Sequence, residues 1–60
     1  MKQGDTYRCV KHGACYRVVC VGLMRFGEGY TKSVTLQDVA QPAFYYTYSY
    51  LEFQQRFYES

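Results

Sequence analysis

Three cysteines and a histidine stand close together in the sequence, and these residue types could bind zinc. Cys9, His12 and Cys15 follow one another at intervals of three, and Cys20 comes five positions later. A structural zinc site needs four ligands in a tetrahedral arrangement, which usually include a C-x-x-C pair. That pair is missing, and alternation along a strand would send Cys15 to the face opposite Cys9 and Cys20. We therefore expect no metal site and no cofactor, with small apolar cysteines and an exposed turn histidine.

The same cysteines could act as nucleophiles if His12 served as their base. Such chemistry needs a thiol and an imidazole within hydrogen-bond distance, and a cleft that excludes water. A chain of 60 residues can hardly build both, and its five acidic residues show no pairing suited to acid–base catalysis. We therefore expect no catalytic residues and no enzyme activity.

Composition limits the size of the core and predicts the cellular location. The chain has the length of one domain, residues 1–60, and aromatic residues make up 20% of it. A chain this small buries only about 60% of the surface that it exposes when unfolded, so large rings must supply much of the burial. An odd number of cysteines, no apolar leader segment and no run of about 18 apolar residues predict a cytoplasmic protein with reduced thiols and no membrane partner.

The first structural unit expected is a β-hairpin. Residues 7–11 and 14–21 are strand-like and flank a His-Gly turn, where Gly13 can adopt positive φ. Pairing Lys11 with Ala14 places one uncharged set of side chains on the core face: Tyr7, Cys9, Tyr16, Val18 and Cys20. The other face then carries Arg8, Val10, Cys15, Arg17 and Val19.

A glycine-rich segment separates this hairpin from two further strands. Residues 22–29 hold three glycines, which predicts a bend followed by a mobile loop. Residues 32–39 alternate as a third strand, and Pro42 ends the extended run because proline cannot donate to a ladder. Residues 44–48, rich in tyrosine, form the fourth strand.

A short helix is expected to begin at Ser49. Ser49 and Glu52 have the spacing of a capping box, in which each side chain bonds the backbone amide of the other residue. Tyr50, Phe53 and Phe57 follow at helical spacing and share one stripe.

The expected fold is therefore mainly β: a small antiparallel sheet of about four strands, bent into an SH3-like barrel, with a short C-terminal helix. Tyr45 and Tyr48 are expected to point at least partly outward. The aromatic side chains of this region that are expected to point inward are Phe44, Tyr46, Tyr50, Phe53 and Phe57.

Two groups of residues carry a resemblance to a known family. The first group is Tyr7, Arg8, Lys11, Gly13, Tyr16 and Val18, and the second is Tyr50, Phe53, Arg56 and Phe57. In these positions the chain resembles a family of short bacterial and phage proteins without an assigned function. It departs from that family at Ser49, where proline is frequent, and over residues 22–43. The resemblance implies a compact SH3-like fold and a phage or mobile-element origin, and brings no catalytic residues.

Binding of another protein is the function that these residues favour. Tyr and Arg are enriched at interface hot spots, and the chain has more aromatic residues than a core of this size should use. The segment Met24-Arg25-Phe26 would anchor a partner, or Phe26 would fold back to cap the barrel. We expect an accessory protein of a phage or mobile element that modulates or inhibits a host or defence protein. The candidate partner-binding residues are Met24, Arg25, Phe26, Tyr30, Tyr45, Tyr48 and Arg17.

The sequence also allows two other kinds of partner in place of a host or defence protein. A small barrel could bind single-stranded nucleic acid by stacking bases on exposed tyrosines beside basic residues, although the net charge is only +2 and the basic residues are scattered. An exposed strand edge could also pair with its twin in a homodimer. The residues that could form the nucleic-acid surface are Tyr30, Tyr45, Tyr48, Arg8, Arg17, Arg25 and Lys32.

Overall fold

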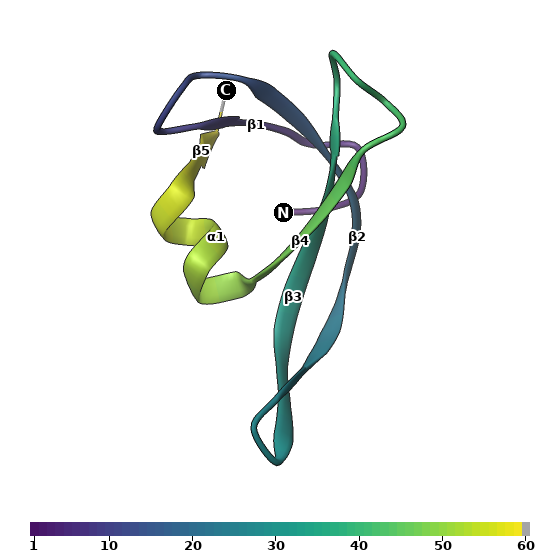
Figure 1. Cartoon of the computed structure of the whole chain (residues 1–60), viewed down its shortest axis with the longest axis vertical. Helices are drawn as coiled ribbons and strands as arrows, with labels where there is room; N and C mark the ends of the chain where they lie inside the picture. The colour runs from purple at the N-terminus through teal and green to yellow at the C-terminus, as the bar shows by residue number, and fades with distance from the viewer. Residues whose placement is uncertain (60) are drawn as a thin grey trace.

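The computed structural model describes residues 1–59, which form one antiparallel sheet and one short helix (Figure 1). Helix α1 (Tyr50–Arg56) lies between the last two strands of the chain. The five strands are β1 (Thr6–Cys9), β2 (Cys15–Phe26), β3 (Gly29–Asp38), β4 (Tyr45–Ser49) and β5 (Phe57–Glu59). Their order in the sheet is β4-β3-β2-β1-β5, so α1 connects the two outermost strands. The expected mainly-β fold with a C-terminal helix is confirmed, but the sheet has five strands and is not closed into a barrel.

β5 is the strand that the sequence pattern did not reveal. Its residue Phe57 was expected to continue the helical stripe, but the helix ends before it and its backbone is extended, with φ −132° and ψ 152°. Phe57 pairs with Cys9 of β1, and Tyr58 pairs with Arg8. This pairing joins residues far apart in the chain, so local helical spacing could not predict it.

The β1–β2 hairpin has a longer connection than expected. Tyr7 lies opposite Tyr16, where Cys9 was expected. The Cys9 N–H donates to the Ala14 carbonyl at 2.9 Å and the Gly13 N–H to the Cys9 carbonyl at 2.7 Å, so residues 10–14 form the connection. Gly13 has φ +70°, as the turn required. Because the register moves by two residues, Tyr7 and Tyr16 keep the core face that the alternation assigned to them.

A β-bulge in β2 reverses the alternation of its side chains. Val18 pairs with Leu36, but the next pair joins Cys20 to Thr35, so an extra residue is inserted at this point. Cys20 is consequently exposed on the outer face, and its expected place in the core is wrong. Val21 takes the core face instead, opposite the buried Val34.

Residues 22–29 are not a loop but the end of a long β-hairpin. β2 continues to Phe26, which pairs with Gly29 across a turn formed by Gly27 and Glu28. Gly27 has φ +60° and no other residue of the turn has positive φ, which matches a type II′ turn. The glycines therefore serve a tight turn and a ladder rather than a mobile segment.

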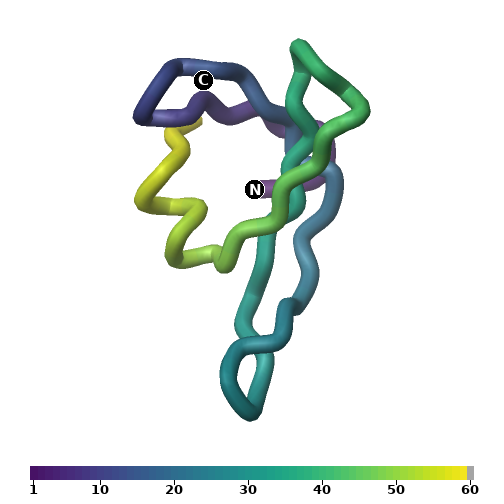
Figure 2. The backbone as a smooth tube through the Cα atoms, viewed as in Figure 1, coloured from purple at the N-terminus to yellow at the C-terminus, as the bar shows by residue number. Residues whose placement is uncertain are grey.

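The end of this hairpin extends beyond the other strands. β4 pairs with β3 only as far as Ser33, opposite Ser49, so residues 23–32 are paired only with each other. We call residues 23–32 the β2–β3 arm; it forms the lower, teal projection in Figures 1 and 2.

Two phenylalanines fill the concave side of the sheet. Phe53 of α1 is 3% exposed and lies 4.9 Å from the Tyr7 ring, edge to face. Phe57 is also buried, and its ring centroid lies 5.4 Å from that of Tyr16 and 5.2 Å from that of Tyr48. These rings lie over the buried aliphatic side chains of β2 and β3, which are Val18, Val34 and Leu36.

Three aromatic residues before the helix differ from the expectation wholly or in part. Tyr48 does not lie on the outer face: it pairs with Val34, shares its face and packs on Phe57, although its side chain is only partly buried. Phe44 precedes β4 and is exposed, and its N–H donates to the Gln41 carbonyl in the turn before that strand. Tyr46 lies on the core face as expected, opposite Leu36 and with its ring centroid 5.9 Å from that of Tyr16, but it is 40% exposed at the margin of the core.

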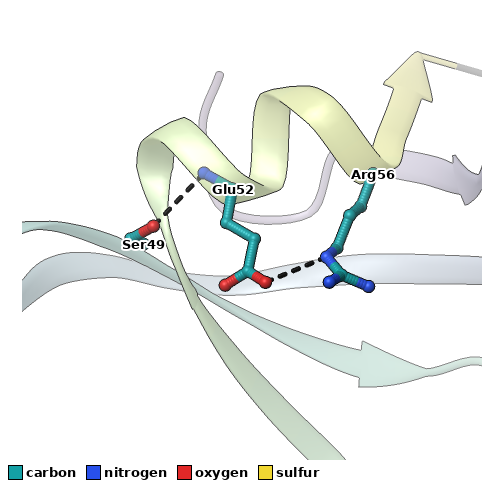
Figure 3. Close-up of polar contacts among 3 residues, drawn as sticks. All are labelled: Ser49, Glu52 and Arg56. Carbon is teal, nitrogen blue, oxygen red and sulfur yellow. Dashed lines mark hydrogen bonds and ion pairs between the residues drawn. The ribbon is translucent and has the colours of Figure 1, made fainter.

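Helix α1 begins where the capping residues predicted (Figure 3). The Glu52 N–H donates to the Ser49 hydroxyl oxygen at 3.2 Å. The Glu52 carboxylate does not serve the reciprocal half of a capping box; it forms an ion pair with Arg56 Nε at 2.9 Å. An acid in the first turn and a base in the last also suit the helix dipole.

Removing the Phe53 ring should cost most of the stability of the protein. Phe53→Ala is expected to lower the free energy of unfolding by about 3–5 kcal/mol, because the ring is buried among other rings. A domain of 60 residues is stable by only roughly 3–9 kcal/mol. Leu51→Ala, on the exposed side of the same helix, should change it by less than about 0.5 kcal/mol. Urea unfolding followed by circular dichroism measures both, and equal small losses would contradict the packing described.

Two tyrosines should make the fold sensitive to alkali. Burial raises the pKa of Tyr7 and of Tyr16 above the usual value near 10, and the carboxylates of Glu59 and Asp38, respectively, raise it further. The unfolded chain therefore ionises first, so this stability is complete below about pH 10 and is lost as pH rises through the raised pKa. Denaturant unfolding between pH 8 and 11 should show this fall, and Tyr7→Phe with Tyr16→Phe should reduce it. An unchanged pH dependence in that double variant would contradict the assignment.

Candidate functional site

The candidate partner-binding residues lie in three separate places. Arg17 and Tyr45 are on the outer face at the end of the sheet away from the arm, and Tyr48 is partly buried against the core. The β2–β3 arm brings four of them together: Met24, Arg25, Phe26 and Tyr30.

Alternation divides the side chains of the arm between two faces. Leu23 lies opposite Lys32 and Arg25 opposite Tyr30, on the face that continues the core side of the sheet. Met24 and Phe26 lie on the outer face. The large apolar side chains of the arm have high exposed fractions: Leu23 73%, Phe26 69% and Tyr30 69%. Phe26 is therefore at the end of the arm and does not cover the core.

The base of the arm is held to the helix by one cation–π contact. Lys32 Nζ lies 4.3 Å from the centroid of the Tyr50 ring, and that ring stacks on Phe53 with centroids 6.3 Å apart. Such contacts contribute about 0.5–1 kcal/mol at an exposed position. The contact fixes the arm where it leaves the sheet and leaves its end uncovered.

Arg17 and Tyr45, on the outer face at the end of the sheet away from the arm, form a separate surface. Arg17 lies opposite Gln37, and Gln37 lies opposite Tyr45. The Gln37 side-chain amide donates to the Pro42 carbonyl at 2.8 Å and to the Tyr45 hydroxyl at 3.3 Å, which holds the tyrosine in place. From Arg17 to the end of the arm, β2 extends roughly 25–30 Å at about 3.3 Å per residue. One small ligand could not contact both places.

Leu23 is the exposed apolar residue that the sequence reading missed. The glycines at positions 22, 27 and 29 predict a loop there, and that prediction conceals the alternation of the strand. Carrying the period-two pattern of β2 past Gly22 would have placed Leu23 beside Arg25 on one face. The chain exposes other large aliphatic side chains, Leu51 and Val10, but each lies apart from the arm, on α1 and in the β1–β2 connection.

The cysteines and the histidine do not converge on one point. Cys9 and His12 line a small pocket of about 230 Å³, which also touches Arg56. Cys15 lies on β2 opposite Arg8, and its side chain is on the face of the sheet opposite to that of Cys9. Over residues 1–59 no group of three His, Cys, Asp or Glu side chains is arranged to hold a metal ion. The pocket is below the roughly 300 Å³ at which small-molecule sites usually begin.

The basic side chains are distributed over different elements. The Arg8 guanidinium donates to the Gly13 carbonyl at 2.8 Å, and Arg56 pairs with Glu52. Arg25 and Lys32 are on the arm, and Arg17 is on the outer face beyond it. No helix in the described part of the chain is long and apolar enough to cross a membrane.

Comparison with known proteins adds no relative to this description. No protein-family model, curated protein or solved structure matches the chain. The similarity to short phage and bacterial proteins remains a prediction from sequence, and the β2–β3 arm is the candidate site that the geometry itself defines.

Proposed function

We propose that the chain is a non-enzymatic module that binds another protein through the β2–β3 arm. The observation that carries this proposal is the exposure of Leu23, Phe26 and Tyr30, each more than two-thirds exposed on a segment that projects from the sheet. Apolar groups bordered by Arg25 and Lys32 have the composition of an interface hot spot, with aromatic anchors and basic residues at the margin.

The backbone of the arm is already ordered, which favours binding. Its residues are paired from Leu23 opposite Lys32 to Phe26 opposite Gly29, and a type II′ turn closes the end. A mobile loop would lose about 1–2 kcal/mol of conformational entropy for each residue that a partner fixed. A paired hairpin has already lost most of that entropy on folding. Binding through its side chains therefore orders less additional backbone, which leaves more of the contact energy for affinity.

The more specific proposal is an accessory protein of a phage or mobile element that acts in the cytoplasm. It would modulate or inhibit a host or defence protein by occupying its surface. The small size and the sequence resemblance support this version. The thiols of Cys9, Cys15 and Cys20 are free, which fits a reducing compartment.

The finer description of the fold as SH3-like is also a proposal. The strand order places β4 and β5 at opposite edges of one curved sheet, and the short helix α1 carries the chain from one edge to the other. Phe53 and Phe57, at the helix and just after it, fill the space inside that curve. This arrangement supports a partly open barrel with the β2–β3 hairpin as its longest projection.

Substitutions on the arm should weaken partner binding without unfolding the protein. Tagged protein is used to capture partners from a host lysate, with nuclease treatment and washes at moderate salt, and the affinity of the recovered protein is then measured by calorimetry. Phe26→Ala and Arg25→Ala should each lower that affinity by roughly tenfold or more, as hot-spot truncations do. Their free energies of unfolding should stay within about 0.5 kcal/mol of the parent value, because both side chains are exposed.

Phe44→Ala is the matched control, since this phenylalanine is also exposed but precedes β4, away from the arm. It should bind like the parent chain. If Phe26→Ala and Arg25→Ala also bind like the parent, the arm is not the binding surface. Recovery of nucleic acid alone, lost steeply as salt rises, would replace the proposal with single-strand binding.

A further inference from the structure

Within the described residues 1–59, the longest unpaired strand edge lies along β2. Towards β1, the last backbone bonds of β2 are those of Val18, which donates to the Asp5 carbonyl and accepts from the Gly4 N–H, both at 2.8 Å. From there to Phe26, no described residue pairs with β2 on the side away from β3. The other free edges are shorter, because β4 has five residues and β5 has three.

Alternation identifies the backbone groups that face this open edge. The N–H and C=O of Val18 point towards β1. The bulge then inserts one residue, so the groups that point away from β3 belong to Val21, Leu23 and Arg25. The turn agrees with this assignment. Phe26 and Gly29 flank a two-residue turn as a pair that exchanges both backbone hydrogen bonds, so the N–H and C=O of Phe26 point towards β3.

We propose that a second copy of the chain pairs with this edge, antiparallel, about a two-fold axis at Leu23. Leu23 then lies opposite Leu23 of the second copy, and Val21 lies opposite its Arg25. Every outward-facing N–H and C=O of Val21, Leu23 and Arg25 gains a partner in this register. The two sheets become one continuous sheet, and the inference rests on the proposed function in taking the arm as the interaction surface.

Other registers are less favourable. An axis at Arg25 would place two arginines directly opposite each other, which is destabilising. An axis at Val21 would set Leu23 against Val19, whose backbone groups face β3. The axis at Leu23 also sets Met24 against Gly22 of the second copy, and the space beside Gly22 is open, with no atom closer than 3.8 Å to an added Cβ.

This edge lacks the features that usually prevent strands from pairing. Residues 19–24 contain no charged residue and no proline, whereas protected edges carry such residues or are very short. Leu23 and the partly exposed Val21 lie on one face, so two copies would join them into one apolar stripe. The β3 side of the arm, with Tyr30 and Lys32, stays open to a different protein.

The test is the mass of the purified chain in solution, measured by sedimentation over about 1–500 μM with a reductant present. The single chain has a mass of 7.1 kDa, and twice that mass is expected at the upper concentrations. Leu23→Lys should raise the dimer dissociation constant by roughly tenfold or more, because it sets two charges together at the axis. Leu51→Lys introduces the same charge at a leucine of similar exposure, 68% against 73%, and should leave the dissociation constant unchanged.

A pair of variants tests the register itself. Val21→Lys would face Arg25 of the second copy and should weaken the dimer, whereas Val21→Glu would face it as an opposite charge and should weaken it much less or strengthen it. Circular dichroism of each variant confirms that the sheet is retained. Equal weakening by both substitutions would overturn the register.

A parent chain that keeps the mass of one copy throughout the concentration range would overturn the dimer. So would equal behaviour of Leu23→Lys and Leu51→Lys. Arg25 takes part in both proposed interfaces, so the wider proposal is judged separately by Phe26→Ala: capture of a different protein through Phe26 can succeed with a chain that is monomeric.

Discussion

The packing of Phe53 and Phe57 against the concave side of the sheet is the interaction on which the rest of the structure depends. Among residues 1–59, only three aliphatic side chains of the sheet are fully buried, Val18, Val34 and Leu36, and they could not stabilise five strands by themselves. The two rings come from consecutive elements, and their centroids lie 5.3 Å apart. Because one belongs to α1 and the other opens β5, the same packing that forms the core also brings the two outermost strands into position.

Burial is unevenly distributed as a result. At one end, the sheet is covered by α1 and by the rings of Tyr7, Tyr16 and Tyr48. At the other end, β2 and β3 continue without a covering layer, and their side chains are exposed on both faces. The arm is thus ordered by its backbone pairing and by the contact of Lys32 with Tyr50, rather than by a core of its own. This is the physical reason why a surface for recognition lies there.

Local signals in the sequence predicted local structure well. Ser49 marked the start of the helix, and Gly13 marked the first turn. The features that were missed depend on pairing between distant residues: β5 exists because β1 is beside it, and Cys20 is exposed because a single inserted residue reverses the alternation. The residue types of the arm predict a binding segment, but its glycines predict a loop rather than a paired arm, and a loop does not single out Leu23. Tyr48 shares the core face with Tyr46, as the period of two along β4 predicts and the expected outward position does not.

The position of β1 between β2 and β5 has a consequence for how the chain folds. β2 and β3 are joined by a tight turn and can pair as soon as both exist, since closing a short loop costs little entropy. β1, in contrast, gains its second neighbour only when the segment after α1 arrives, and this long-range contact closes a loop of nearly the whole chain. Contacts of high sequence separation slow folding. During synthesis, the outer edge of β1 therefore stays unpaired until β5 is made, while the local pairings of β2 with β1 and with β3 can form earlier.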